Sequence, residues 1–225
     1  MMLAIDKLCR QLGYQFTDQQ LIEQALTHRS AGGKNNERLE YLGDAILGFV
    51  IADALFRHFP HASEGQLSRL RSSLVKRDTL AEIAREYALG DYLTLGSGEL
   101  RSGGHSRSSI LADGVEAIFA AIYLDGGYES AREVILTIFS KRLQGLNLEH
   151  HQKDPKTRLQ ELLQARKLDL PTYEVTEISG DPHEQMFSVL CTVAELDQQM
   201  KGIGASRRKA EQDAAARMLN TLNHE

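Results

Sequence analysis

Four carboxylates in two short segments have the spacing of a possible metal site. Glu40 and Asp44 are four residues apart in NERLEYLGDAIL, and Asp113 and Glu116 are three apart in ILADGVEAIF. On a helix, each spacing places both carboxylates on one face, about one turn apart. An acidic pair of this kind is usually a solvent-exposed helix surface. Its repulsion, roughly 0.2–0.5 kcal/mol, would be reversed by a bound cation.

The second pair lies in an apolar segment, where ionised carboxylates need compensation. No Lys or Arg occurs within four residues on the C-terminal side of Asp113, so a metal or a distant base must supply it. Carboxylates without neighbouring Cys or His suit a hard cation, Mg²⁺ or possibly substituting Mn²⁺, rather than zinc. Such a site could activate water and hydrolyse a phosphodiester. The surrounding apolar residues are Ile110, Leu111, Val115, Ile118, Phe119 and Ile122.

The elements that would position these carboxylates are helices. Residues 36–58 have apolar side chains at three- and four-residue steps, as a core-facing helix requires. Capping boxes are expected at 17–20, with Thr17 as the cap, and at 63–66. The polar, glycine-bearing segment 97–109 predicts a loop before the next helical run. We therefore expect an all-α domain over residues 1–145.

The character of the sequence changes after a segment without periodicity, 146–153, which we interpret as a linker. Asp154 followed by Pro155 predicts a capped helix start. Three strand-like segments bounded by turn residues follow, and an alanine-rich amphipathic helix ends the chain. The predicted fold class is multidomain, with a small α+β domain of order α-β-β-β-α over 154–225.

Composition sets wider limits on the kind of protein. The net charge is -5, and residues 154–225 contain nine Lys/Arg against twelve Asp/Glu, so any binding of nucleic acid must rely on local basic clusters. Cys9 and Cys191 have no metal-ligand spacing and are expected to be buried thiols. No run of about 18 apolar residues and no leader pattern is present, which predicts a cytoplasmic protein without a membrane partner.

The segment Asn36–Asp44, NERLEYLGD, resembles the signature of bacterial ribonuclease III. The resemblance extends through ALTHRS, LADGVEAI and the C-terminal domain, and covers nearly the whole chain. It implies an endoribonuclease that hydrolyses double-stranded RNA with Mg²⁺ and leaves 5′-phosphate and 3′-hydroxyl ends with two-nucleotide 3′ overhangs. Precursors of ribosomal RNA and some messenger RNAs are the implied substrates. The implied assembly is a homodimer.

The resemblance also implies roles for the acidic residues. Glu40, Asp113 and Glu116 match metal ligands, and Asp44 matches a residue that helps to hold and activate the water. The implied catalytic residues are therefore Asp44 and Glu116, of which Glu116 is indispensable. Two further acids match peripheral positions, Glu37 beside the site and Glu64 in the dimer valley. An exposed apolar surface around Leu42, Ile46 and Phe49 would suit a dimer, although core packing explains these residues equally well.

The C-terminal domain resembles the double-stranded-RNA-binding domain, which reads the shape of an RNA duplex at three separate places. The first helix offers neutral groups to a minor groove, the turn between the first two strands offers a histidine, and the start of the last helix offers free amides and three cations to phosphate. Each of these features alone is also common on surfaces that bind nothing. The candidate residues are Thr157, Gln160, His183, Ser206, Arg207, Arg208 and Lys209.

Two other functions remain possible on the sequence alone. A non-catalytic protein that binds double-stranded RNA would keep this fold without hydrolysis, and the presence of all four carboxylates argues against it. A phosphohydrolase of small nucleotides would leave the C-terminal domain without a purpose. His28 invites comparison with phosphohydrolases that use a His-Asp pair, but Arg29 follows it, so we interpret His28 as structural.

Overall fold

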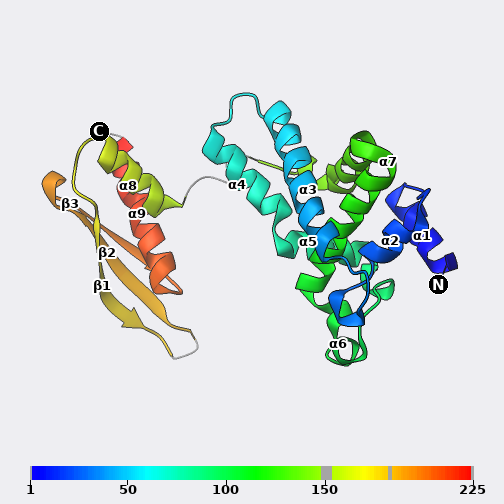
Figure 1. Cartoon of the computed structure of the whole chain (residues 1–225). Helices are drawn as coiled ribbons and strands as arrows, with labels where there is room; N and C mark the ends of the chain where they lie inside the picture. The colour runs from blue at the N-terminus through cyan, green and yellow to red at the C-terminus, as the bar shows by residue number, and fades with distance from the viewer. Residues whose placement is uncertain (1, 148–153, 182–183, 224–225) are drawn as a thin grey trace. The chain divides into compact units, whose positions relative to one another are not determined.

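The computed structural model describes residues 2–147, 154–181 and 184–223, which form two compact units, Met1–His151 and Gln152–Glu225 (Figure 1). From residue 148 onward, the predicted linker 146–153 lies outside the described residues. Within the described ranges, every helix is too short or too polar to cross a membrane.

The first unit is helical, as predicted, and strands are absent from the part of it that the structure describes. Two of its helices, α3 and α7, carry the four carboxylates. Its α-helices are α1 (Met2–Leu12), α2 (Gln19–Ala25), α3 (Glu37–His58), α4 (Glu64–Val75), α5 (Arg77–Glu86), α6 (Ser97–Arg101) and α7 (Ser108–Gln144).

Capping follows the sequence at one helix and departs from it at another. Ser63 and Gln66 form the predicted capping box at the start of α4. The prediction of Thr17 as the cap of α2 is wrong, because Asp18 is the N-cap and its Oδ1 accepts the amide of Gln20 at 2.9 Å. The Thr17 amide instead donates to Asp125 Oδ2 at 2.9 Å.

The segment 97–109 is more ordered than the predicted loop. It contains α6 and a 3-10 turn, Gly104–Ser106, before α7 begins at Ser108. A half-buried ion pair explains the helical structure of this segment, since Arg107 Nη1 lies 2.7 Å from Oε1 of Glu99, whose side chain is 20% exposed. The prediction of a plain loop was therefore wrong.

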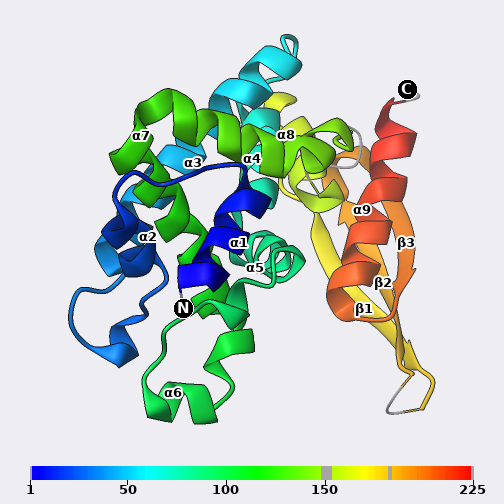
Figure 2. The ribbon, with the colours of Figure 1, turned by 90° about the vertical axis from the view of Figure 1, so that its right-hand side faces the viewer.

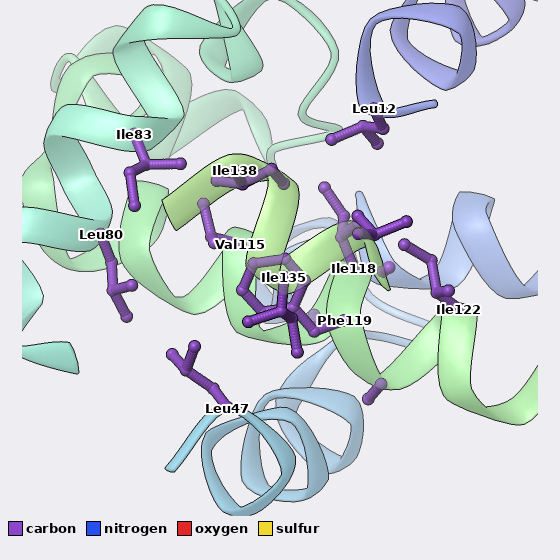
Figure 3. Packing of buried hydrophobic residues seen from close by; sticks show 14 of the residues in the cluster. Leu12, Leu47, Leu80, Ile83, Val115, Ile118, Phe119, Ile122, Ile135 and Ile138 are labelled. Carbon is purple, nitrogen blue, oxygen red and sulfur yellow. The ribbon is translucent and has the colours of Figure 1, made fainter. Parts of the chain in front are cut away.

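The core of the first unit is built around α7. Leu47 of α3 faces Phe119 and Ile135 of α7 in this core, and all three side chains are fully buried (Figure 3). The helix breaks at Gly127, whose φ of 78° and ψ of −177° suit only glycine. Apolar side chains before and after this break pack into the same core. This packing fixes α7, the helix that carries Asp113 and Glu116.

The second unit has the predicted order of helix, three strands and helix (Figure 2). The sheet is antiparallel with strand order β1-β2-β3, and the two helices α8 and α9 pack together. A side chain at Gly202 would meet the backbone of α9 at Ala210 and Ala214, so the helix lies directly on β3. The bounds are α8 (Pro155–Ala165), β1 (Thr172–Ser179), β2 (Met186–Val193), β3 (Gln198–Gly204) and α9 (Arg207–Asn223).

Both cysteines are free and buried, one in each unit, as the sequence predicted. Cys9 belongs to the core of the helical unit and Cys191 to the core between sheet and helices in the second unit. They serve as small apolar side chains in these cores.

Candidate functional site

The acidic site lies where α3 packs against α7. Glu40 lies in the first turn of α3, and Asp113 and Glu116 lie near the start of α7. Gly43, one turn after Glu40, allows the close approach, because a side chain there would collide with the backbone carbonyl of Glu116. Two segments more than 70 residues apart in sequence thus bring their carboxylates together.

Three of the four predicted carboxylates form one cluster. Glu40, Asp113 and Glu116 each offer an oxygen, and these oxygens all lie within 4.8 Å of one another. All three residues are half-buried. A hard divalent cation takes oxygen ligands and keeps several waters, so this open, all-oxygen set fits Mg²⁺ or Mn²⁺.

Burial raises the pKa values of all three clustered carboxylates, and the negative charges of neighbouring acids add to the rise at Glu40 and Glu116. The pKa of Glu116 is raised to about 8 by burial first and then by the negative charges of Asp44, Asp113 and Glu40. Burial and then the charge of Asp113 raise the pKa of Glu40. Burial also raises the pKa of Asp113, although the charges of His28 and Arg29 oppose it. A bound cation would stabilise the ionised forms of all three carboxylates.

Asp44 lies beside the cluster without being part of it. It is exposed and stands one helical turn after Glu40 in α3. After burial, its charge is the largest influence on the pKa of Glu116. Asp44 is therefore close enough to influence the charge of Glu116, and its own carboxylate is open to solvent.

A cavity of about 460 Å³ opens beside Glu40 and Asp113. Its walls include two arginines that sequence analysis missed, Arg29 and Arg107. Each is paired with an acid on the same wall: Arg29 Nη1 lies 3.4 Å from Glu37 Oε1, and Arg107 pairs with Glu99. Glu37 thus borders the cavity beside the site, which agrees with the peripheral position that the family resemblance implies. The arginines reach the site through tertiary packing, which no local sequence pattern indicates.

His28 lines the same cavity and is held firmly. Its Nδ1 accepts the amide of Ser30 at 3.2 Å, and its own amide donates to the carbonyl of Thr94 at 3.0 Å. Such bonding is what a structural histidine requires, as the sequence analysis expected. Among the neighbours of Asp113, His28 is also the one that most strongly opposes the rise in the pKa of that carboxyl.

A second, apolar cavity of about 560 Å³ lies between α3 and α4. Glu64 lines it together with Phe49 and Phe56, which are 61% and 71% exposed. The expected apolar surface is thus only partly present around the predicted residues. Leu42 and Ile46 are half-buried and pack on the core, whereas Phe49 is exposed.

In the second unit, the predicted contacts of α8 lie on its first turns. Asp154 caps the helix by accepting the amides of Lys156 and Thr157. The Thr157 hydroxyl donates to Asp154 Oδ2 at 2.9 Å, which leaves its oxygen free to accept a further hydrogen bond. Gln160 is exposed one turn later. Both side chains can therefore offer neutral polar atoms to a ligand.

The start of α9 carries the predicted basic cluster. Ser206 Oγ accepts the amide of Lys209 at 3.3 Å, so Ser206 caps the helix. Arg207, Arg208 and Lys209 are all exposed, and Arg207 Nε donates to Glu211 Oε1 at 2.9 Å. The remaining predicted contact, His183, lies outside the described residues.

Two family models match the chain, one for each unit. The model described as "Ribonuclease-III-like" matches residues 18–143, and the model described as "Double-stranded RNA binding motif" matches residues 155–222. The two matches leave unassigned the segment that joins the units.

Curated proteins and solved structures are similar over long stretches. The chain is 58% identical to Ribonuclease 3 of Legionella pneumophila (strain Lens) over 99% of both chains, and 56% identical to Ribonuclease 3 of Vibrio vulnificus (strain YJ016) over 98% of both. The crystal structure of the nuclease domain of ribonuclease III from Campylobacter jejuni, at 42% identity, covers 64% of this chain and 98% of that one, with a TM-score of 0.61.

Proposed function

We propose, from the premise that this chain belongs to the ribonuclease III family, that it hydrolyses phosphodiester bonds within double-stranded RNA at the site of Glu40, Asp113 and Glu116. The observation that carries the proposal is the convergence of these three carboxylates within 4.8 Å. The same chain has a double-stranded-RNA-binding motif, which accounts for the choice of substrate.

The three clustered carboxylates would hold a divalent cation, for which we propose Mg²⁺ with Mn²⁺ as a substitute. The cation, when bound, would lower the pKa of a water molecule and neutralise charge on the phosphate. Glu116 would hold the cation from α7 together with Asp113, and we propose it as a catalytic residue as well as a ligand. Asp44, exposed beside Glu116, would orient that water and accept its proton, and is thus proposed as a catalytic residue.

The second unit would bind the duplex by its shape. Thr157 and Gln160 would meet the minor groove and its 2′-hydroxyls, and Ser206 to Lys209 would meet phosphates across the adjacent groove. His183, between them in the family pattern, would provide the remaining contact. The unit as a whole is acidic, so these local clusters must supply the affinity, which we expect to fall steeply with salt.

We further propose that two copies associate and that each site cuts one strand, which yields two-nucleotide 3′ overhangs with 5′-phosphate and 3′-hydroxyl ends. Another structure of the Campylobacter jejuni domain is described by flexibility in a region involved in dimer formation. In this chain, the apolar cavity between α3 and α4, with Phe49 and Phe56 exposed at its wall, supports such an interface. Ribosomal RNA precursors and some messenger RNAs in the cytoplasm are the proposed substrates.

A cleavage assay tests the proposed activity. A labelled RNA duplex and its separate strands are incubated with the protein in Mg²⁺ or in Ca²⁺, and the product ends are mapped. We expect the protein to cut the duplex and not the separate strands, and to do so in Mg²⁺ and not in Ca²⁺. A protein that binds the duplex in both metals and never cuts it would be the non-catalytic alternative, and the proposal would be wrong.

The proposed dimer is tested by sedimentation of two matched variants. Phe56→Ser removes an exposed aromatic ring from the cavity, whereas Leu124→Ser removes an apolar side chain of 51% exposure from α7. We expect the first variant to dissociate at concentrations where the second and the wild type remain dimeric. Equal dissociation of both variants would show that the cavity is not the interface.

A further inference from the structure

One carboxylate of the second unit joins its two helices. Glu211, in the second turn of α9, accepts Lys156 Nζ of α8 at 2.6 Å through Oε2 and Arg207 Nε at 2.9 Å through Oε1. Its side chain is only 12% exposed. Both oxygens of a nearly buried carboxylate are thus engaged, each with a different helix start.

The lysine of this bridge is held on its other side by the sheet. Lys156 Nζ lies 4.4 Å from the centre of the Tyr173 ring of β1, and its side chain is 34% exposed. Burial alone would raise the pKa of Glu211, but the hydrogen bonds from Lys156 and Arg207 hold it below its usual value. The carboxylate of Glu211 is therefore ionised at neutral pH.

The bridge adjoins both groups of residues that we propose for RNA binding, and one of its members, Arg207, belongs to the basic cluster of α9. Lys156 immediately precedes Thr157 in α8, and Arg207 immediately precedes Arg208 in α9. The two helices also lie side by side in both views of the fold (Figures 1 and 2). An RNA duplex presents its minor groove and the next phosphates at a fixed separation, so the spacing of the two helix starts decides whether both bind at once.

We propose that Glu211 is a positioning residue for RNA binding, which sets the distance between the groove-binding start of α8 and the phosphate-binding start of α9. The inference rests on the proposed function of the second unit. It assigns Lys156 and Arg207 to holding this spacing, and it leaves Arg208 and Lys209 as the cations that meet phosphate.

The proposal predicts an effect opposite in sign to simple electrostatics. Glu211→Gln removes a negative charge from a domain that binds a polyanion, and charge alone would tighten binding. Loss of the bridge would instead weaken it. A control with the same change in charge is Asp169→Asn, which alters an exposed acid in the connection between α8 and β1.

The experiment measures duplex binding by the full chain in Ca²⁺ and steady-state cleavage in Mg²⁺. For E211Q we expect the dissociation constant and KM to rise about 3-fold to 10-fold with kcat unchanged, and for D169N we expect binding equal to wild type or tighter. E211Q that binds as tightly as D169N would overturn the inference. Wild-type protein that bound no duplex would overturn the proposed function and this inference with it.

Variants of Lys156 distinguish loss of the bridge from loss of folding as the cause of weaker binding. Binding is compared at a temperature well below the melting transition of every variant. Lys156→Met removes the other end of the bridge and keeps an apolar stem over Tyr173, and we expect K156M/E211Q to bind no more weakly than the weaker single variant. Additive losses would mean that Lys156 contacts RNA by itself, and the inference would be wrong. If E211Q does not fold, K156R and K156M carry the test. We expect binding to be kept in K156R and weakened about 3-fold to 10-fold in K156M. Equal binding by the two variants would overturn the inference.

Discussion

Gly43 of α3 lies directly against the backbone carbonyl of Glu116 in α7, and a side chain at position 43 would occupy the space of that carbonyl. Gly43 also lies between Glu40 and Asp44 in sequence, the two acids that α3 contributes. The close crossing of the two helices at this glycine therefore sets the distance between carboxylates that come from different parts of the chain.

Gly43→Ala is expected to push the helices apart. Overpacking at a tight helix crossing costs about 1–3 kcal/mol, and the displaced Glu116 should weaken metal binding and cleavage. Gly48→Ala is the matched control, because a side chain at Gly48 of the same helix meets nothing within 4 Å. It should stabilise the protein by about 0.5–1 kcal/mol and leave cleavage unchanged. Thermal unfolding and cleavage rates of the two variants check this, and equal behaviour would contradict it.

The raised pKa of Glu116 predicts how the metal-free protein responds to pH. In the unfolded chain Glu116 ionises at the ordinary 4.5, whereas in the folded protein its pKa is about 8. The unfolded state thus releases this proton first as pH rises, so the contribution of Glu116 to stability is full below 4.5 and is lost as pH rises through about 8.

Melting temperatures in a chelator between these two pH values measure the effect. Wild type should lose stability with rising pH more steeply than Glu116→Gln, and added Mg²⁺ should restore stability at the upper end by favouring the ionised carboxylates. An identical pH dependence of wild type and E116Q would show that Glu116 is not the titrating group.

Salt dependence tests the basic start of α9. Arg208→Gln should weaken duplex binding for all sequences alike and reduce the slope of log affinity against log salt by about one, as expected for one lost phosphate contact. Arg217→Gln is the control, since Arg217 lies toward the other end of α9 and pairs with Asp213 at 3.1 Å. The same reduction in both variants would remove the proposed phosphate contact.

Local sequence patterns predicted much of the fold and the acids of the site. Helical periodicity placed Glu40 and Asp44 on one face, and the apolar setting of Asp113 and Glu116 indicated a need for positive charge. The expectation that the two pairs converge came from the family resemblance, because no local pattern encodes the helix crossing at Gly43.

What the sequence could not predict depends on long-range contacts. Thr17 and Asp18 are both residue types that cap helices well. Asp125 of α7 decides between them, because its carboxylate accepts the backbone amides of Thr17 and Asp18 and so fixes the chain before α2. Arg107 and Glu99 order a segment that composition describes as a loop. Their pairing is visible only once the chain is folded.

The central claim is that the clustered carboxylates hold the cation that cuts RNA, and Glu116→Gln tests it most directly. This change keeps the size of the side chain and removes its charge; Glu133→Gln, on the exposed face of the same helix, is the control. Duplex binding in Ca²⁺ and cleavage in Mg²⁺ are measured for both variants. The account predicts wild-type binding by both, with cleavage lost by several orders of magnitude only in E116Q. Near-normal cleavage by E116Q would contradict it.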